Sequence, residues 1–519
     1  MNLMQSLLTH TSARVLEFES VRDLLRGYAP SPLGQGRIAA LCPSVDPGWI
    51  ENQHRLATEI REYRRVGGRF EFFGLLDVSK TVEKSRISGA VLETTEIRDV
   101  LLVLDRAAEW REIALSPPAA MKVAWSAVTH LSSGIIDFTE FLGAFHNKIL
   151  PEGTLDDRAS PELARIRREI ERQKRLIQES LRGYLKRLAE GGAVQDELIT
   201  IRGERFVIPI KVEQKRRVQG VVHGASSSGQ TVFVEPLETI EQNNELVRQL
   251  DEELAEIHRI LLEMTRRIGE SAGPILKAAE VLAELELQFA KARFAEEYNC
   301  APVTLLEPDS RNPNRSPGHS RSGLSEPGSA RLILHNARHP LLERNLRARK
   351  GKVVPISIEL EGENLELVIT GPNTGGKTVA LKTVGLLALM AQSGIPVSAD
   401  RADLPAFDAV LADIGDYQSI EQNLSTFSAH VTNIDFISRT ATPHSLVLLD
   451  ELGSATDPEE GAALAVAIAE HFRRIGCITV ISTHHTSLKV YGANTPGVVN
   501  SSVGFDEATL QPTYELKVG

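Results

Sequence analysis

The segment that most constrains the fold of this 519-residue chain is a glycine-rich run, Gly371–Thr378, with the sequence GPNTGGKT. It fits the spacing G-x-x-x-x-G-K-S/T, and it lies between a strand-like run, Leu365–Thr370, and a helix predicted to begin near Lys377. Small residues allow successive backbone N–H groups to turn around phosphate oxygens, and a helix N-terminus adds positive potential there. Chance would place the four fixed residues in only about 0.02 of chains of this length. The segment therefore predicts a phosphate-binding loop between a strand and a helix.

Two residues at the end of this loop have the chemistry needed to handle a nucleoside triphosphate. We expect Lys377 to neutralise the β and γ phosphates and the Thr378 hydroxyl to bind Mg²⁺. The predicted nucleotide-binding residues are Gly371, Pro372, Asn373, Thr374, Gly375, Gly376, Lys377 and Thr378.

Two adjacent carboxylates follow another apolar run further along the chain, Leu446–Leu449. Asp450 suits the outer-sphere hold on Mg²⁺, and Glu451 can polarise a water for in-line attack on the γ phosphate. Apolar strands that end in an acid are common, so the pair is informative because it follows the phosphate loop in chain order. We therefore predict Asp450 as a metal residue and Glu451 as the catalytic base.

A third apolar run, Ile478–Ser482, is followed closely by two histidines, His484 and His485. A histidine at this strand end can sense the γ phosphate, although a histidine in such a place is more often a capping or surface residue. We favour His484 over His485 for the functional role. With Lys377 and Glu451, His484 completes the predicted catalytic set.

The region from residue 331 to 519 alternates short apolar runs with helical stretches such as Thr378–Gln392 and Glu459–Arg474. This alternation predicts a sheet covered by helices, which is an α/β domain. The stretch before it, Glu307–Ala330, is rich in Pro, Gly and Ser and cannot bury enough surface to repay its ordering entropy. We therefore predict a flexible linker over residues 301–330.

The part of the chain before that linker has mainly helical periodicity. This periodicity predicts a mostly helical core over residues 1–157. Leu163–Leu188 and Leu237–Phe294 are long and periodic, with apolar residues at steps of three and four in the second stretch. Between them, Gln195–Pro236 contains short β-rich runs punctuated by glycine, which predict a small antiparallel sheet. The expected divisions are a lever helix (158–194), a β-rich clamp tip (195–236) and a returning lever helix (237–300).

The overall charge and its distribution along the chain lead to opposite expectations about nucleic acid. Lys and Arg number 58 against 69 Asp and Glu, and the formal charge of −11 argues against a uniformly basic, nucleic-acid-coating surface. However, the net charge is +6 over Arg158–Arg187 and +4 over Arg202–Arg217, whereas it is −5 over Glu245–Glu286. Basic residues on a β tip can neutralise nucleic-acid phosphates. The candidates in the tip are Lys211, Lys215, Arg216 and Arg217. For the Arg-rich helix, contact with nucleic acid and a solvated face with i,i+4 ion pairs are equal alternatives.

The sequence has the features of a cytoplasmic protein. Its two longest uncharged runs, Val218–Val234 and Thr383–Ala399, are too short and too polar to read as membrane spans. The first residues lack the basic and apolar regions of a secretion signal. The three cysteines, Cys42, Cys300 and Cys477, are far apart and odd in number, which suits a reducing compartment.

These motifs, in this order, resemble the MutS family and in particular its bacterial MutS-two branch. The ATPase motifs are shared by all MutS relatives, whereas the β tip and Thr456-Asp457-Pro458 favour this branch. The similarity covers nearly the whole chain and includes Val15–Phe18, Ser31–Gly34, Arg205–Pro209, Val222-His223, Ser228-Gly229, Phe233–Pro236, Ala337–Pro340, Gly371–Gly385, Asp413–Asp416, Gln418–Ile420, Leu424–Ser428, Asp450–Gly453 and Asn500–Val503.

The resemblance implies an ATPase that uses ATP and Mg²⁺. It implies a multidomain α and α/β fold, in which a helical core and a lever with an inserted β clamp tip precede an ABC-type P-loop ATPase domain. It also implies a homodimer, in which Ser425 would lie in a signature-like segment that reaches the γ phosphate bound by the other subunit. Two dimer-related hairpins would then form a clamp around DNA.

The resemblance leaves two functions open. The first is an ATP-gated clamp on branched or recombining DNA that suppresses homologous recombination. The second is a factor that binds the ribosome and its rRNA and splits stalled or collided ribosomes. A transporter-type ATPase subunit is disfavoured, because such subunits lack a helical hairpin of this kind before the phosphate loop.

The chain departs from the family pattern in two places. Mismatch-reading relatives insert a Phe-x-Glu motif from an N-terminal domain, and the nearest approach here, Phe70-Glu71-Phe72, has a different spacing. Mismatch recognition is therefore not expected. The branch typically continues into a coiled region and an Smr nuclease domain, whereas this sequence ends at Gly519, so nuclease activity is not expected from these residues.

Overall fold

The computed structural model describes residues 13–190, 198–227, 229–306, 331–372, 375–415, 426–454, 457–506 and 511–519. The fold is mixed α and α/β, and the chain divides into two compact units. Unit 1 contains Met1–Leu75, Trp110–Gly134 and Glu280–Gly519, and unit 2 contains Leu76–Glu109 and Ile135–Ala279. Within the described ranges, no helix has both the length and the hydropathy needed to cross a membrane.

Unit 2 combines helices with one four-stranded antiparallel sheet. The sheet has the strand order β1-β2-β4-β3. Its strands are β1 (Thr200–Arg202), β2 (Arg205–Lys211), β3 (Gly220–Ala225) and β4 (Thr231–Pro236), with the 3-10 turns η2 (Val212–Arg217) and η3 (Leu237–Thr239). The helices are α5 (Ser79–Ser85), α8 (Thr139–Phe145), η1 (Asp157–Ala159), α9 (Pro161–Glu190) and α10 (Ile240–Glu270), with part of α6 (Thr94–Leu115) and the start of α11 (Ala272–Glu297).

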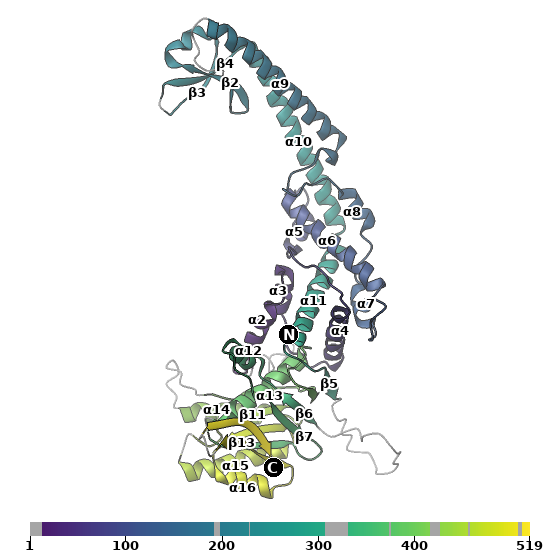
Figure 1. Ribbon diagram of the computed structural model, residues 1–519, viewed down its shortest axis with the longest axis vertical. Coiled ribbons are helices and arrows are strands. Elements are labelled where there is room, and N and C mark those ends of the chain that lie inside the picture. The colour runs from purple at the N-terminus through teal and green to yellow at the C-terminus, as the bar shows by residue number, and fades with distance from the viewer. Residues whose placement is uncertain are drawn as a thin grey trace. The chain divides into compact units, whose positions relative to one another are not determined.

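The sheet of unit 2 packs one face against α9 and α10 (Figure 1). Alternate residues of β2 point to this face because side chains alternate along a strand. The buried cluster contains Ile177, Leu181 and Leu185 of α9, Phe206, Ile208 and Ile210 of β2, Val232 and Val234 of β4, and Leu246 of α10. This packing leaves η2, which connects β2 to β3, at the surface of the unit.

The returning helical stretch is divided, unlike the single stretch expected from its periodicity over Leu237–Phe294. Helix α10 ends at Glu270 and α11 begins at Ala272. A continuous helix would need the nitrogen of Pro274 to donate to the Glu270 carbonyl four residues earlier, and proline has no N–H. Pro274 therefore indicates this break between the two helices, whereas the spacing of apolar residues does not.

Unit 1 contains a four-stranded sheet with the order β5-β9-β6-β7. Strand β5 (Val303–Leu306) lies inside the range predicted as a linker, so that prediction is wrong at its start. Its apolar and β-branched residues pair in parallel with β9 (Arg401–Pro405). The other two strands are β6 (Leu332–Ala337) and β7 (Ile356–Leu360). Residues 307–330 of the predicted linker lie outside the described residues.

The helices of unit 1 include several from the first part of the chain. They are α2 (Phe18–Arg26), α3 (Pro32–Ala39), α4 (Pro47–Arg65), α7 (Ser126–Ser132) and α12 (Pro340–Ala348), together with the larger part of α11. Residues of α2 and α11 share one buried core with the strands and helices of the C-terminal region.

A six-stranded sheet forms the C-terminal part of unit 1, with the order β10-β11-β12-β8-β13-β14. The first five strands run parallel, and β14 is antiparallel to β13. The strands are β8 (Glu366–Thr370), β10 (Val410–Asp413), β11 (Leu446–Leu449), β12 (Ile478–Thr483), β13 (Val498–Asp506) and β14 (Gln511–Val518). Because Leu449 pairs with Ile481 and Ile481 with Val368, the carboxyl ends of β11, β12 and β8 meet at one edge.

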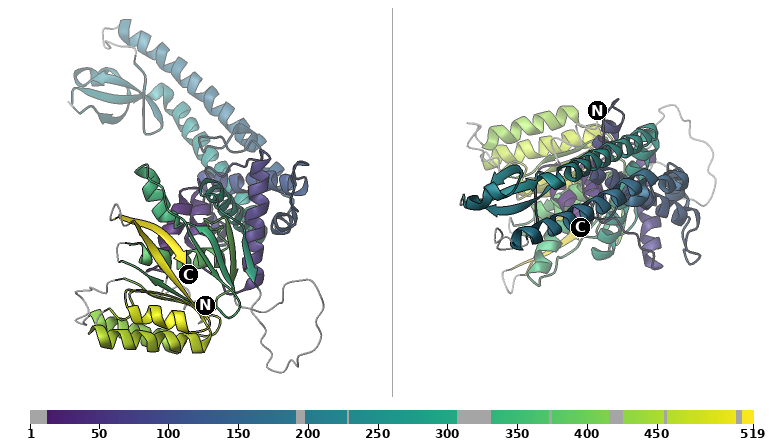
Figure 2. Two further views of the ribbon diagram at one scale, coloured as in Figure 1. Left: turned by 60° about the horizontal axis from the view of Figure 1, so that its bottom comes forward. Right: turned by 90° about the horizontal axis from the view of Figure 1, so that it is seen from above.

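Different helices bury the two faces of this sheet. Leu367 and Ile369 of β8 belong to the core that contains α13 (Lys377–Gln392). Val368 belongs to the core on the other face, with α14 (Thr426–Thr440), α15 (Pro458–Ile475) and α16 (Thr486–Asn494). Figure 2 shows α14 and α15 together on one side of the strands. The result is a layered arrangement of helices, sheet and helices, which explains why the central strands are apolar without alternation.

Strand β8 begins with a buried glutamate that has no hydrogen-bonding partner among the described residues. Glu366 is 1% exposed, and neither of its carboxylate oxygens is hydrogen-bonded there. Burial raises the pKa of Glu366 to about 8, and the positive charge of Arg473 opposes that shift. The carboxyl group is therefore protonated at neutral pH.

We expect Glu366→Gln to change how unfolding depends on pH. A carboxyl group with a raised folded pKa stabilises the folded state fully only below its unfolded pKa, near 4.5, and this contribution is lost as pH rises through about 8. A tenfold difference in proton affinity between the folded and unfolded states corresponds to about 1.4 kcal/mol of stability. When thermal unfolding is measured at increasing pH, from about 4.5 to about 8, the wild-type protein should lose stability relative to Glu366→Gln. Glu363→Gln, in the exposed turn before β8, is the control, and the same pH dependence in all three proteins would contradict the prediction.

Candidate nucleotide-binding site

The loop after β8 has no room for side chains at two of its glycines, Gly371 and Gly375. A Cβ atom on Gly371 or on Gly375 would lie 2.5 Å from Cγ2 of Val503 in β13. Gly371 has a φ of 139°, and Gly376, directly before α13, has a φ of 92°. L side chains rarely adopt such a φ, so these positions favour glycine. The backbone of the loop can therefore approach a ligand closely, as a phosphate cradle requires.

Lys377 and Thr378 occupy the first two positions of α13. Lys377 is 1% exposed, and its Nζ donates a hydrogen bond to the Gly371 carbonyl at 2.6 Å. Burial lowers the pKa of Lys377, and the charges of Glu451 and Asp450 oppose that shift. The ammonium group therefore lies at the loop, within electrostatic range of both acids.

Asp450 is held at the end of β11 by contacts with three other segments. Thr378 Oγ1 donates to its Oδ2 at 2.8 Å, and Ser482 Oγ donates to its Oδ1 at 2.5 Å. The Asp450 N–H donates to the carbonyl of Asp413, the last residue of β10, at 2.8 Å. The structure thus brings together the two residues expected to hold the metal, although they come from separate motifs.

Glu451 has a strained backbone conformation. Its φ of 50° lies in the left-handed region, which costs a residue with a side chain about 1–3 kcal/mol. Its N–H donates to Ser482 Oγ at 2.9 Å, and the N–H of Leu452 donates to the Ser482 carbonyl at 3.1 Å. These bonds fix the turn after β11 to the end of β12 and present the Glu451 carboxylate beside Asp450.

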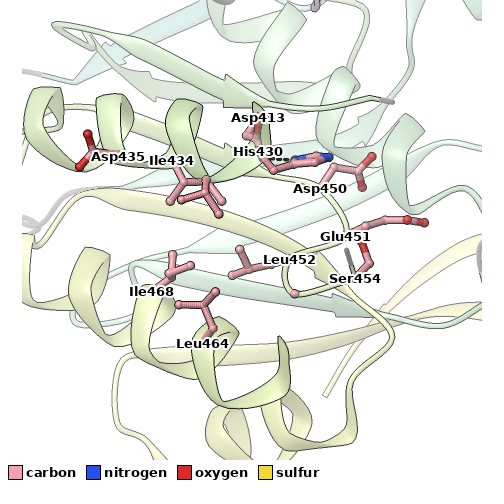
Figure 3. A pocket seen from close by; sticks show the side chains of 12 residues that line it. Asp413, His430, Ile434, Asp435, Asp450, Glu451, Leu452, Ser454, Leu464 and Ile468 are labelled. Carbon is pink, nitrogen blue, oxygen red and sulfur yellow. Dashed lines mark hydrogen bonds and ion pairs between the residues drawn. The ribbon is translucent and has the colours of Figure 1, made fainter. Parts of the chain in front are cut away.

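A pocket of about 220 Å³ opens next to the two acids (Figure 3). At its polar end, Nδ1 of His430 lies 2.8 Å from the Asp413 carboxylate, which also accepts a bond of 2.8 Å from Asn433 Nδ2. These two contacts attach α14 to the end of β10. The apolar wall of the pocket consists of Val431, Ile434, Leu452, Leu464 and Ile468.

His484 follows β12 and is exposed. Partial loss of solvent around the imidazole and the neighbouring His485 lower the pKa of His484, and the negative charge of Glu451 opposes them. The two imidazole rings are 4.3 Å apart. Nε2 of His485 is buried and lacks a hydrogen-bonding partner among the described residues. His484 therefore lies within electrostatic range of Glu451, while its role in binding phosphate stays a prediction.

Three residues at the site were not among the sequence-predicted residues. Val503 packs on two loop glycines, and Cδ1 of Tyr514 lies 3.2 Å from where a Cβ atom of Gly376 would be. Tyr514 also has an unusual backbone, with a φ of 60°. Ser482 contacts both acids, as described above. Val503 lies in a stretch that carries the family resemblance, but its place at the site depends on the pairing of β13 with β8. The places of Ser482 and Tyr514 depend in the same way on the pairing of β12 with β8 and of β14 with β13.

Three sequence-predicted site residues lie outside the described residues. They are Asn373 and Thr374 in the phosphate loop and Ser425 in the signature-like segment. Their roles stay predictions.

The oxygen donors beside the loop fit Mg²⁺. The Thr378 hydroxyl and the Asp450 carboxylate are hard donors, 2.8 Å apart. Mg²⁺ usually takes one or two protein carboxylates and completes its octahedron with phosphate and water. In the parts of the chain that the structure describes, no group of three or more His, Cys, Asp or Glu side chains could hold a metal ion. The donor set therefore suits a metal ion that binds together with phosphates.

The four cations predicted to contact nucleic acid are exposed on unit 2. Lys211 ends β2, and Lys215, Arg216 and Arg217 lie in the last turn of η2. They are close together in sequence and lie on the connection that the sheet core leaves at the surface.

Several charged or polar side chains of unit 2 contact one another within the chain. Glu235, whose side chain is 2% exposed, contacts Arg205 at 2.9 Å and His223 at 2.6 Å. On α9, Arg165 and Lys174 form ion pairs with glutamates three or four residues away. These α9 pairs are the arrangement expected for a solvated helix face.

Comparison with known proteins gives matches over nearly the whole chain. The pattern of MutS domain V matches residues 367–519. The chain is 40% identical to "Endonuclease MutS2" of Thermomicrobium roseum over 511 residues, which are 98% of this chain and 62% of that protein. It is 40% identical to the protein of that name from Pelotomaculum thermopropionicum (97% of this chain, 60% of that protein) and 38% identical to that from Geobacillus thermodenitrificans (98% and 61%).

The chain spans about three fifths of the length of these relatives. The matched domain includes the end of β8, the phosphate loop, the two acids and His484. The similarity to the longer relatives also covers unit 2 with its sheet, because it extends over 98% of the chain. The chain therefore belongs to the MutS family, on its MutS2 branch.

Proposed function

We propose that the chain is an ATP-dependent DNA clamp that binds and hydrolyses ATP in an ABC-type P-loop domain over residues 331–519. The observation that carries the proposal is the contact of Thr378 with Asp450. It joins the start of α13 to the end of β11, so that the phosphate loop, the metal donors and Glu451 share one edge of the sheet.

Each residue of the proposed site has a separate task. The backbone N–H groups of the loop bind phosphate oxygens, and the Lys377 ammonium neutralises the β and γ phosphates. Thr378 and Asp450 hold Mg²⁺, which when bound neutralises phosphate charge. Glu451 accepts the proton of the attacking water, and His484 hydrogen-bonds the γ phosphate.

The proposal includes a homodimer, in which Ser425 of one subunit completes the ATP site of the other. Membership of the MutS family supports this arrangement. ATP binding would then bring together the ATPase domains of the two subunits. The two hairpins, one from unit 2 of each subunit, would close around the nucleic acid.

The proposed partner is branched or recombining DNA, and the proposed outcome is suppression of homologous recombination. The four exposed cations of the tip support a phosphate-bearing partner. The relatives are named endonucleases, a name that refers to action on nucleic acid, and those proteins are longer than this chain.

We expect neutralisation of the tip to weaken binding to a four-way DNA junction. The variant combines Lys211→Gln, Lys215→Gln, Arg216→Gln and Arg217→Gln. Each lost phosphate contact should reduce the slope of log affinity against log salt concentration by about one, because fewer counterions are released. Titrations of junction DNA at several salt concentrations measure both effects. Arg165→Gln on α9 is the control, because Arg165 is already paired on its own helix.

Ribosomes, tested at the same salt concentrations, distinguish the two functions left open by the sequence. Binding to ribosomes without binding to junctions would replace the DNA assignment with the ribosome-splitting role. An unchanged salt slope in the tip variant would show that η2 does not contact the partner.

A further inference from the structure

Ser482 lies near the end of β12, next to the turn that carries the two acids, and is fully buried. Its hydroxyl accepts the Glu451 N–H at 2.9 Å and donates to Asp450 Oδ1 at 2.5 Å. A serine hydroxyl has one proton and two lone pairs, so it can make both bonds at once. A charged acceptor at the end of such a chain strengthens the bonds within it. One side chain thus connects the metal-holding acid to the backbone of the proposed base.

We propose that Ser482 is a positioning residue that fixes Asp450 and Glu451 relative to one another. It turns Oδ1 of Asp450 toward β12, which leaves Oδ2 directed at Thr378. It also supplies the acceptor that holds the left-handed Glu451. This inference rests on the proposed ATP hydrolysis and adds a residue that acts through the two acids without touching the nucleotide.

Other bonds hold the same turn, so the contribution of the hydroxyl can be isolated. The Asp450 N–H is bonded to the Asp413 carbonyl, and the Leu452 N–H is bonded to the Ser482 carbonyl. Neither bond involves the Ser482 side chain. Ser482→Ala therefore removes both hydroxyl bonds and leaves the strand and the backbone contacts of the turn in place.

A second serine of the same sheet provides a matched control. Ser501 in β13 is 3% exposed, and its hydroxyl donates to the Val368 carbonyl at 3.3 Å. Ser501→Ala thus removes a buried hydroxyl from the sheet without removing a bond to either acid.

The first test needs no nucleotide. In the full chain, we expect Ser482→Ala to speed hydrogen exchange at the Glu451 amide by about tenfold, because that N–H loses its acceptor. Exchange at the Leu452 amide should stay unchanged, since its acceptor is a backbone carbonyl. Ser482→Thr should retain the wild-type rate at Glu451, and so should Ser501→Ala. Equal exchange at Glu451 in the wild-type and Ser482→Ala proteins would overturn the inference.

The second test separates positioning from nucleotide binding. We expect Ser482→Ala to lower kcat for ATP by about 10- to 100-fold and to leave the Kd for ATP within about twofold. In a Glu451→Gln background, Ser482→Ala should reduce the residual rate much less, because residues that act as a unit are not additive. A full additive loss in the double variant, or an unchanged kcat in the single one, would overturn the inference.

A hydroxyl rescue completes the design. Ser482→Thr should restore kcat, because threonine retains the hydroxyl group. If the extra methyl group of threonine prevents folding, Ser482→Cys is the second variant. Its thiol is a weaker hydrogen-bonding group of similar size, so kcat should be intermediate. Absence of Mg²⁺-dependent hydrolysis in the wild-type chain would instead reject the proposed function, and the exchange result at Glu451 would still test the structural role of Ser482.

Discussion

Glu451→Gln is expected to stop ATP turnover while leaving ATP binding intact. Glutamine has nearly the same shape as glutamate, and the bond from the residue 451 N–H to Ser482 Oγ does not involve the side chain that changes. An amide cannot accept the proton of the attacking water, and loss of a general base typically costs a factor of about 10² to 10⁴. Phosphate release and equilibrium ATP binding, measured on the same preparation with Mg²⁺, separate the two effects.

A glutamate on the next helix controls for the loss of negative charge near the site. Glu459, exposed in the first turn of α15, can be changed by Glu459→Gln without touching the acid turn. Its turnover should stay within about twofold of wild type, as is usual for surface substitutions. Undiminished hydrolysis by Glu451→Gln would show that another group activates the water.

Lys377→Ala should weaken ATP binding by about 100-fold. The ammonium group is the positive charge that the loop itself contributes, and a hydrogen bond to a charged group contributes about 1.5–3 kcal/mol. The substitution also leaves an empty volume, because Lys377 is almost fully buried. Lys377→Met retains most of that volume without the charge, so equal losses in the two variants would assign the effect to charge.

A lysine on the same helix provides the control for Lys377. Lys382 pairs with Glu17 at 2.8 Å and lies beyond the phosphate loop. Lys382→Ala should change the Kd for ATP by less than about twofold, with a small loss of stability at most, because the ion pair is partly exposed to solvent. Equilibrium titration with ATP, with and without Mg²⁺, measures all three variants. An unchanged Kd in Lys377→Ala would contradict the proposed phosphate site.

The phosphate loop and the acids were predictable because consecutive residues carry both the chemistry and the geometry. In Gly371–Thr378, the glycines, the lysine and the helix start form one local unit, and Asp450 follows its strand directly. Ser482 and Tyr514 differ in this respect. Their contacts depend on β12 and β14 taking particular places in a six-stranded order, which is a property of the tertiary structure.

Smaller differences from the expected fold also have physical causes. β5 has only four residues, and its partner β9 lies about a hundred residues later, so its apolar run was hard to separate from the linker that was expected there. The division of α10 from α11 was predictable from Pro274, whereas apolar periodicity continues across it. On α9, charge counts could not distinguish cations paired within the helix from cations available to a partner.

The order in which the chain is synthesised matters for unit 1, because the unit combines three separated segments. Leu16 packs beside Gly385 of α13, and Leu16, Phe18 and Val21 belong to the core that this helix shares. The residues of unit 2 are all made once Ala279 has left the ribosome, but the first segment of unit 1 must wait for Glu280–Gly519. Contacts between such distant residues form slowly, and apolar surface exposed in the interval promotes aggregation. Helix α2 therefore reaches its buried place only after α13 has been synthesised, and its apolar face stays exposed until then.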